Sequence, residues 1–312
     1  MSKPYVEAAV AVLRRPDGQV LLGQRPAGKP WAGWWEFPGG KIESGETPLH
    51  ALQRELHEEL GIEAEVVHPW LTRMFEYPER IVKLRFFVIP QWHGEPHGRE
   101  GQQLSWQLPA NVKVAPLLPA NAPIMDALNL PPVYAITNLH EMGHKQFFAA
   151  LQQTLTHGVR LIQVREKQLS ADEQQNFCAE VIAHTRPHGA RVLLNGDIAM
   201  ARRVDADGVH LSSAHLAALP ERPHDMLCAA SCHTPQELAQ AEKLACDFVV
   251  LSPVMTTKSH PDVPSLGWEN FRAMIADYSL PVYALGGMRA ELLQTVWRNG
   301  AHGIAMQRAI WE

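Results

Sequence analysis

Between Leu108 and Val133 the chain carries six prolines, and this cluster limits how it can fold more than any other feature. Proline fixes φ and donates no backbone hydrogen bond, so the stretch cannot form a long helix or strand. The pair that ends the cluster is the natural boundary. The sequence therefore predicts two domains, residues 1–130 and 131–312, which suits a length of 312 residues. The prolines are Pro109, Pro116, Pro119, Pro123, Pro131 and Pro132.

Composition excludes several classes of protein. A net charge of −5 argues against stable nucleic-acid binding, because a broad binding surface needs clustered positive charge. We expect no membrane span and no signal peptide, since the sequence has neither a long apolar run nor a signal-peptide core at its start. The cysteines form no CxxC pair, which predicts reduced, mostly buried thiols and a cytoplasmic protein. They are Cys178, Cys228, Cys232 and Cys246.

After the boundary, short apolar strands alternate with helices. This alternation implies parallel strands joined by right-handed crossovers, and so an α/β fold. About eight such units predict a closed (β/α)₈ barrel of the TIM type, although it is small against the usual ~250 residues. An open doubly wound sheet is the alternative. Strands should begin at Val133, Leu161, Val192, Gly208, Met226, Phe248, Pro281 and Gly303, with helices such as Ala171–His184, Pro235–Leu244 and Ala290–Arg298 between them.

The segment from Gly39 to Ile62 reads GGKIESGETPLHALQRELHEELGI, and its second half predicts a helix. Thr47 is a suitable N-cap, Pro48 suits the first turn, and Gly61 suits the end. Leucines at helical spacing should form the buried face: Leu49, Leu52, Leu56 and Leu60. We assign Leu13, Leu21, Leu22 and Phe86 to the core of the same domain.

Glu55, Glu58 and Glu59 fall within an arc of roughly 100° on this helix, beside the apolar face. Three carboxylates so close together repel one another unless a cation neutralises them. Hard oxygen ligands on one face suit Mg²⁺ or Mn²⁺. Arg54 could pair with a neighbouring carboxylate and orient it. The alternative is a solvated glutamate-rich helix face, which is common.

The complete spacing favours the metal site. It runs Gly40, five residues, Glu46, seven residues, Arg54-Glu55, an apolar residue, any residue, Glu58-Glu59, any residue, Gly61 and an apolar residue. This matches the Nudix box at every fixed position. With VEAAVAVLRRPDGQVLLGQRP, WWEFPGGK, EPHGREGQ and LLPANAPI, the first domain resembles the MutT branch of Nudix hydrolases. The resemblance implies an α+β fold, an α/β/α sandwich with a mixed sheet. It also implies hydrolysis of 8-oxo-dGTP to the monophosphate and pyrophosphate, which keeps oxidised guanine out of DNA.

The resemblance also implies a metal site and a catalytic set. The metal, Mg²⁺ or Mn²⁺, would neutralise the phosphates and activate water. Its ligands would be the Gly39 carbonyl, Glu55, Glu58, Glu59 and Glu100 in GREGQ. Either Glu55 or Glu100 would accept the proton from the water. The catalytic set is Glu55, Glu58, Glu59 and Glu100 together with the box residues Arg54 and Glu46.

Substrate contacts are expected outside the box. Asn121 would present its amide to the guanine edge, because an amide offers a donor and an acceptor together. It could instead be a turn residue among prolines. Arg25 and Arg80 match substrate contacts in the MutT branch, and Phe37 and Tyr77 could line the base pocket. Each of these could also be structural.

From Val133 to Trp311 the chain resembles the thiamine phosphate synthase/TenI family, through VYAIT, GVRLIQVREK, ADGVHL and ALGG. The resemblance implies a site for a thiamine precursor at the carboxyl ends of the barrel strands. The turn at Gly286-Gly287 could bind phosphate through backbone N–H groups. The candidate residues are Gln163, Arg165, Lys167, Asn195, Asp207, Ser231, His233, Lys258 and Gly287.

This second segment also departs from the family. Active synthases usually have Asn-Asp where this chain has Asn195-Gly196, so one Mg²⁺ carboxylate is absent or shifted to Asp197. Ser212-Ser213 replaces a GQ-like segment, and Gln307-Arg308 stands where a phosphate-binding serine is expected. Three functions stay open: a synthase, a tautomerase-like enzyme with His233 as proton carrier, and a non-catalytic binding module.

The two resemblances together favour an oxidised-nucleotide hydrolase that carries a barrel of open activity. An alternative is a bifunctional thiamine-related enzyme, whose Nudix domain hydrolyses thiamine pyrophosphate-type compounds or whose barrel is the working synthase. A third hypothesis is a sensor, in which the barrel binds a thiamine precursor and modulates the hydrolase. In each case the expected partners are small molecules.

Overall fold

The computed structural model describes residues 3–257 and 264–312. The chain forms two compact units, and the boundary falls after Asn129, one residue before the predicted position. The short segment Ile275–Ser279 is grouped with the first unit. Lys258, one of the candidate residues of the barrel, lies outside the described residues.

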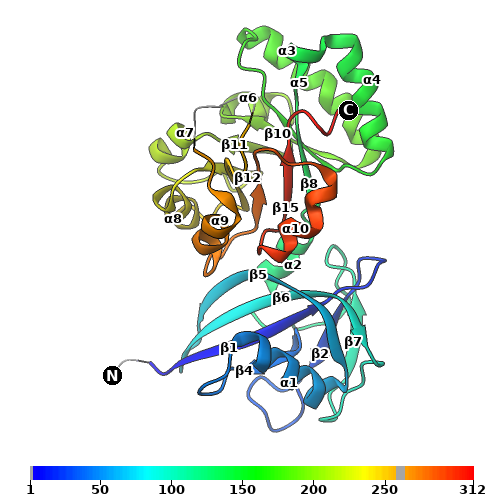
Figure 1. Ribbon diagram of the computed structural model, residues 1–312, viewed down its shortest axis with the longest axis vertical. Helices are drawn as coiled ribbons and strands as arrows, with labels where there is room; N and C mark the ends of the chain where they lie inside the picture. The colour runs from blue at the N-terminus through cyan, green and yellow to red at the C-terminus, as the bar shows by residue number, and fades with distance from the viewer. Residues whose placement is uncertain (1–2, 258–263) are drawn as a thin grey trace. The chain divides into compact units, whose positions relative to one another are not determined.

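The first unit contains two sheets (Figure 1). The four-stranded sheet has the order β4-β1-β6-β5, and it is mixed because β1 and β6 are parallel whereas the other pairs are antiparallel. The second sheet is antiparallel, with the order β3-β2-β7. The elements are β1 (Tyr5–Leu13), β2 (Val20–Gln24), β3 (Trp35–Glu36), β4 (Gly39–Lys41), α1 (Pro48–Leu60), β5 (Glu63–Glu76), β6 (Ile81–His93), β7 (Leu104–Gln107) and α2 (Ala122–Leu128).

Side chains of β1 show why helices cover both faces of its sheet. Successive residues of a strand point to opposite faces. Ala9, Ala11 and Leu13 join the core that includes α1, whereas Val10 and Val12 join the core that includes α2. This is the predicted α/β/α sandwich. The residues assigned to the core, Leu13, Leu21, Leu22 and Phe86, are all buried.

Helix α1 begins and ends where its caps predict. Thr47 Oγ1 accepts a hydrogen bond from the His50 N–H, and Gly61 has a φ of 68°, the left-handed conformation that ends many helices. The prediction for Leu49 is wrong, because its side chain is 41% exposed. Leu49 lies in the first turn, before the part of the helix that packs on the sheet, and the buried face starts at Ala51. The other predicted leucines, Leu52, Leu56 and Leu60, are buried.

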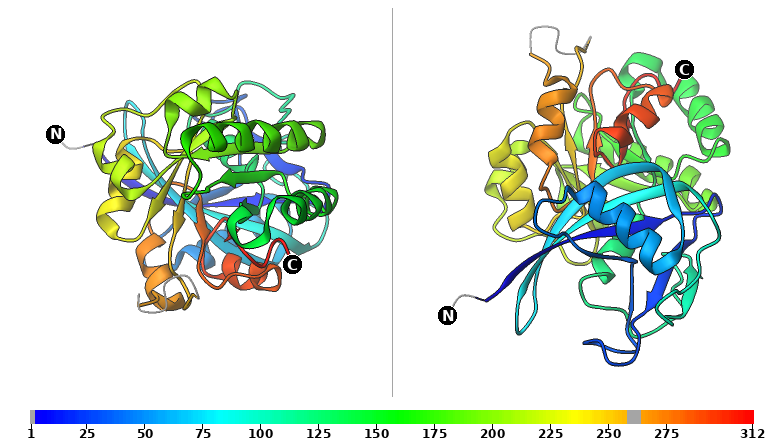
Figure 2. Two further views of the ribbon diagram at one scale, coloured as in Figure 1. Left: turned by 90° about the horizontal axis from the view of Figure 1, so that it is seen from above. Right: turned by 60° about the horizontal axis from the view of Figure 1, so that its bottom comes forward.

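The second unit is a closed barrel of parallel strands in the order β10-β11-β12-β13-β14-β15-β8-β9, which excludes an open sheet. Each strand starts within one residue of its predicted position. In the left view of Figure 2, helices surround the barrel strands. The strands are β8 (Val133–Ile136), β9 (Leu161–Val164), β10 (Arg191–Asn195), β11 (Gly208–Leu211), β12 (Leu227–Cys232), β13 (Phe248–Leu251), β14 (Val282–Ala284) and β15 (Gly303–Met306).

The barrel helices also follow the sequence signals. In α5 and α8 the N-caps Ser170 and Thr234 form capping boxes with Glu173 and Glu237. The predicted helix Ala290–Arg298 is split into a 3₁₀ turn and α10. The elements are α3 (Leu139–Met142), α4 (His144–Thr156), α5 (Ala171–Thr185), η1 (Arg186–His188), α6 (Ile198–Arg203), α7 (Ser213–Ala218), α8 (Pro235–Lys243), α9 (Gly267–Ile275), η2 (Ala290–Leu292) and α10 (Leu293–Arg298).

All four cysteines are buried free thiols, as predicted. Burial raises the pKa of Cys178 and of Cys232 to about 12, so both remain protonated at neutral pH. None of the helices in the described part of the chain has the length and apolar character needed to span a bilayer.

Candidate functional site

Two glycines bring the start of the box directly against α1. Gly39 has a φ of 139°, and a Cβ on it would lie 2.2 Å from the carbonyl oxygen of Ala9. A Cβ on Gly40 would lie 2.2 Å from the carboxyl carbon of Glu55. Because a Cβ on Gly39 would clash with backbone, β4 can occupy this place only with glycine there, whereas a side chain at position 40 would displace the Glu55 carboxylate. The backbone of β4 therefore lies beside the Glu55 carboxylate.

Arg54 pairs with three acidic residues around it. Its Nε and Nη2 donate to the two Glu46 oxygens at 2.8 and 3.0 Å, and its Nη1 donates to Glu55 at 2.8 Å and to Glu58 at 3.1 Å. The hydrogen bonds from Arg54 are the largest cause that lowers the pKa of Glu46 to about 2. Of these acids only Glu55 lines the adjoining pocket. Arg54 thus holds Glu55 in place, whereas Glu46 and Glu58 remain outside.

The loop before β7 docks on the C-terminal end of α1. The Arg99 backbone N–H and the Gln102 Nε2 both donate to the Glu59 carbonyl at 3.0 Å. These bonds satisfy a carbonyl that the last turn of a helix leaves without a partner. Glu100 lies between the two donors in sequence, and it lines the same pocket as Glu59. The segment GREGQ binds helix α1, which carries Glu59. This contact places the Glu100 carboxylate in the same pocket as the Glu59 carboxylate.

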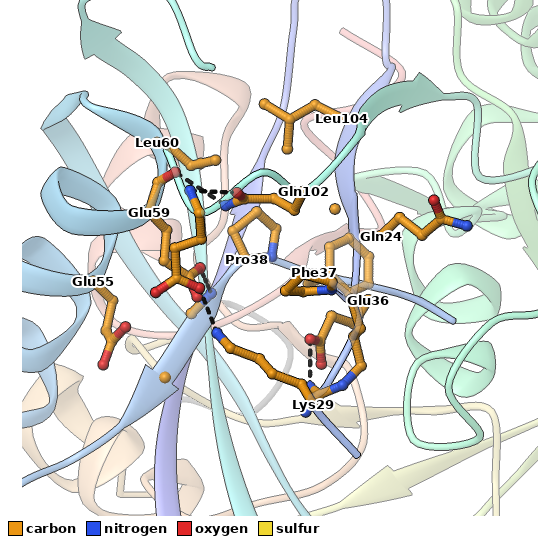
Figure 3. A pocket seen from close by; sticks show the side chains of 16 residues that line it. Gln24, Lys29, Glu36, Phe37, Pro38, Glu55, Glu59, Leu60, Gln102 and Leu104 are labelled. Atoms are coloured by element: carbon orange, nitrogen blue, oxygen red, sulfur yellow. Dashed lines mark hydrogen bonds and ion pairs between the residues drawn. The ribbon is translucent and has the colours of Figure 1, made fainter. Parts of the chain in front are cut away.

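The pocket has a volume of about 260 Å³, and Glu55, Glu59 and Glu100 line it. Figure 3 shows Glu55 and Glu59 on one side of this pocket. The Glu59 carboxylate accepts a hydrogen bond of 3.3 Å from the Gly39 N–H. Burial, followed by the charge of Glu55, raises the pKa of Glu59 to about 7. A cation brought into this pocket would therefore face a group of acidic oxygens that is incompletely neutralised.

Oxygen ligands of this kind suit Mg²⁺ or Mn²⁺. Glu55, Glu59, Glu100 and Gly39 all line the pocket, whereas Glu58 does not. Within the described residues no three acidic, histidine or cysteine side chains are close enough together to hold a metal ion as they stand. Two of the carboxylates are paired with cations instead, Glu100 with Lys29 and Glu55 with Arg54. The residues fit a divalent metal in kind and number once Glu55 and Glu100 turn from these partners.

Two of the predicted substrate residues, Arg25 and Phe37, line this pocket. Arg25 is half-buried, and it donates to the Pro30 carbonyl at 2.7 Å and pairs with Glu36. Burial raises the pKa of Glu36, although Arg25 opposes the shift. Arg80 is exposed and does not line the pocket.

Aromatic side chains gather beside Arg25. Tyr77 packs on Phe75 with ring centres 4.6 Å apart and on Trp31 at 5.9 Å, and Trp31 packs on Trp34 at 4.9 Å. Burial raises the pKa of Tyr77, and the charge of Glu36 adds to the shift. These contacts place the tryptophan-rich loop close to the pocket wall that carries Glu36.

Asn121 is buried, with only 4% of its surface exposed, and it does not line the pocket. Its Nδ2 has no hydrogen-bond partner among the described residues, and its side chain does not cap α2. Leaving such a donor unpaired costs about 1–3 kcal/mol. The Asn121 N–H bonds to the Leu118 carbonyl, and Leu118 bonds to Trp35 of β3. Asn121 is thus both a turn residue and an amide with an unused donor.

A second pocket, of about 700 Å³, opens at the carboxyl ends of the barrel strands. Six of the candidate residues line it: Gln163, Arg165, Lys167, Ser231, His233 and Gly287. The buried ring of His210 lies between the Tyr134 hydroxyl at 3.1 Å and the Ser231 hydroxyl at 2.9 Å. Burial, followed by the charge of Arg165, lowers the pKa of His210 to about 3, so it stays neutral.

Comparison with known proteins decides the family of each unit. The NUDIX domain model matches residues 4–128, and the thiamine monophosphate synthase model matches residues 133–310. The chain belongs to both families. The NUDIX domain is fused to the thiamine monophosphate synthase domain, and the proline-rich segment ends at their junction.

Relatives of the NUDIX domain differ in the nucleotide that they are named for. An 8-oxo-dGTP diphosphatase of Haemophilus influenzae is 41% identical over 128 residues, which cover 41% of this chain and 94% of that protein. A CTP pyrophosphohydrolase of Escherichia coli is 43% identical over 122 residues, 39% of this chain and 90% of that protein. The other domain is 35% identical over 180 residues to a putative thiamine-phosphate synthase 2 of Aquifex aeolicus, 57% of this chain and 96% of that protein.

In the thiamine monophosphate synthase domain, the His215 ring lies beside Gly196, the position at which active synthases have a carboxylate. A Cβ on Gly196 would lie 2.6 Å from the His215 ring, which in turn contacts the Ser212 hydroxyl at 2.9 Å. Asp197 does not take over this role, because its Oδ1 accepts a 2.8 Å hydrogen bond from the Met200 N–H and caps α6. The residues at this end of β10 therefore do not fit the Mg²⁺ expected of a synthase.

Two candidate residues of the thiamine monophosphate synthase domain do not line its pocket. Asn195 accepts a hydrogen bond of 3.3 Å from Gln163, so it supports a lining residue. The prediction that Asp207 belongs to the site is wrong. Asp207 precedes β11, so it lies at the end of this strand that is opposite the pocket. Its carboxylate accepts a hydrogen bond of 2.7 Å from the Val192 N–H and ties β11 to β10. Arg308 lines the pocket and forms a bidentate ion pair with the Glu141 carboxylate.

Four polar residues of the NUDIX pocket were not predicted from the sequence: Gln24, Lys29, Glu36 and Gln102. Glu36 belongs to the motif WWEFPGGK, and Gln102 belongs to the motif GREGQ. Their positions in these motifs could have identified both as residues of the site. Lys29 lies in a loop without periodicity, and nothing in the sequence marks it as a partner of Glu100.

Proposed function

We propose that the NUDIX domain hydrolyses 8-oxo-dGTP to the monophosphate and pyrophosphate. One arrangement supports this most strongly: Glu55, Glu59 and Glu100 line a pocket whose other walls carry Arg25 and Lys29. Mg²⁺ or Mn²⁺ held by the three carboxylates would neutralise the phosphate chain and lower the pKa of a water molecule. The cationic side chains would bind the phosphate oxygens that the metal leaves free.

The reaction needs a group that removes a proton from water as its oxygen bonds to phosphorus. Glu55 and Glu100 are the candidates, because both are carboxylates that line the pocket. The bond that breaks joins the attacked phosphorus to the oxygen that bridges the α- and β-phosphates. Pyrophosphate leaves with this oxygen if water attacks the α-phosphorus, and the monophosphate leaves with it if water attacks the β-phosphorus. Arg54 would act as a positioning residue for Glu55.

Asn121 supports a guanine-type base, oxidised or not. Its unused Nδ2 donor needs an acceptor, and the O6 of guanine is one. CTP is the rival substrate, since a similar protein is named for it and cytosine also offers acceptors. Thiamine pyrophosphate is the second rival, because the chain also carries a thiamine monophosphate synthase domain.

Pyrophosphate release by the full chain with Mg²⁺ tests the proposal on 8-oxo-dGTP, dGTP, CTP and thiamine pyrophosphate. We expect kcat/KM for 8-oxo-dGTP to exceed the others by roughly tenfold or more. Glu55→Gln should lower it by about 100-fold or more, and the exposed Glu63→Gln should leave it unchanged. Asn121→Ala should lower kcat/KM for 8-oxo-dGTP and dGTP alike by roughly tenfold, whereas the exposed Asn111→Ala should not. Preferential turnover of CTP or thiamine pyrophosphate would refute the assignment of the base.

For the barrel we infer binding of a phosphorylated thiamine precursor without Mg²⁺. The Asn195-Gly196 pair supports this, because glycine stands where active synthases have a carboxylate and Asp197 caps α6 instead. Arg165 and Lys167 supply positive charge for a phosphate, and His233 could still carry a proton.

Calorimetry with thiazole phosphate, in EDTA and in Mg²⁺, tests the barrel. We expect the same affinity in both, and Lys167→Gln should weaken it by about fivefold or more. Mixing thiazole phosphate with hydroxymethylpyrimidine pyrophosphate should yield no thiamine phosphate. A Mg²⁺-dependent product would show that the barrel is a working synthase.

A further inference from the structure

Lys29 lies among the carboxylates of the NUDIX pocket although it comes from a different wall. Its side chain extends across the pocket toward the side on which Glu55 and Glu59 lie (Figure 3). Its ammonium group pairs with Glu100. The ammonium occupies one oxygen of Glu100, Oε2, so it competes with a divalent metal for the negative charge of this carboxylate.

The ion pair is open enough to exchange. The side chains of Lys29 and Glu100 are 45% and 43% exposed, and ion pairs of this exposure contribute little to stability. A metal held by several carboxylates at once displaces such a partner readily. Arg54 differs, because it binds Glu46 through two nitrogens and stays anchored when Glu55 turns to a ligand.

The loop that carries Lys29 has a fixed base and an exposed tip. The Arg25 N–H donates to the Trp34 carbonyl at 2.8 Å, and the Gly33 N–H donates to the Arg25 carbonyl at 2.9 Å. Lys29 and its neighbours at the tip are exposed. The long, flexible stem of a lysine can therefore swing without unfolding the loop.

We propose that Lys29 is an exchangeable counter-ion of the metal site. Its ammonium group neutralises Glu100 until a divalent ion binds there, and it then transfers to the phosphate chain of the substrate. This role rests on the proposed metal-dependent hydrolysis. It makes metal and triphosphate binding cooperative, because each metal bound releases a cation for the substrate.

Mn²⁺ binding to the full chain without nucleotide, measured by electron paramagnetic resonance, tests the first half of this exchange. Lys29→Gln should bind Mn²⁺ about two- to fivefold more tightly than the unmodified protein, since the competing pair is gone. Lys29→Arg keeps the charge and should behave like the unmodified protein. Lys3→Gln removes another lysine–glutamate pair, outside the pocket, and should have no effect.

Binding of the imido analogue of inorganic triphosphate, with and without Mn²⁺, tests the second half and does not depend on the base. The factor by which Mn²⁺ strengthens its binding should fall about fivefold in Lys29→Gln and persist in Lys29→Arg. Unchanged or weaker Mn²⁺ binding by Lys29→Gln, or an undiminished factor, overturns the exchange. A chain that shows both expected effects but hydrolyses no nucleotide refutes the proposed function and leaves the exchange standing.

Discussion

At the scale of single residues, the Glu59 carboxyl group should make the stability of the metal-free NUDIX domain depend on pH. Burial raises its pKa from 4.5 to about 7. Between these values the unfolded chain has released the proton whereas the folded chain retains it, so stability falls as the pH rises. We expect a loss on the order of 2 kcal/mol between pH 4.5 and pH 7. Scanning calorimetry in EDTA measures it as a falling transition temperature.

Glutamine at this position has no proton to release, so Glu59→Gln should remove most of the pH dependence. Glu58→Gln is the matched control, because Glu58 lies one residue away with its side chain 57% exposed. It should keep the full dependence. An equal pH dependence in Glu59→Gln and in the unmodified protein would mean that other groups cause it.

At the scale of elements, periodic segments were predictable from the sequence and loops were not. Helix α1 has a cap at each end and an apolar face, so local signals fixed its bounds. The place of Lys29 depends on where its loop meets GREGQ in space, which no local signal encodes. The error on Asp207 has a related cause. The motif ADGVHL indicates a strand, but it does not show at which end of the barrel Asp207 lies. In the structure the Asp207 carboxylate binds the neighbouring strand β10.

At the scale of the whole molecule, the barrel was predictable from its strand–helix pattern, whereas the α/β/α sandwich was expected from the family resemblance. The barrel repeats one strand–helix unit, and β1 alternates its side chains between two helical layers. The chemistry of the barrel was less predictable, since it depends on one close contact between His215 and Gly196. The effect of a substitution in a family motif can therefore be judged only when the residues that contact it in the fold are known.

The same scale yields a prediction about independence of the two domains. The NUDIX domain aligns with 94% of the Haemophilus influenzae 8-oxo-dGTP diphosphatase, so a chain little longer than this domain forms a complete protein there. We expect a fragment of residues 1–130 to fold and to hydrolyse its substrate with kcat/KM within roughly twofold of the full chain. Pyrophosphate release and circular dichroism measure this, with Glu55→Gln in the fragment as the blank. A folded fragment with less than a tenth of the full activity would contradict independence. It would favour the sensor hypothesis, in which thiazole phosphate should change the hydrolase rate of the full chain.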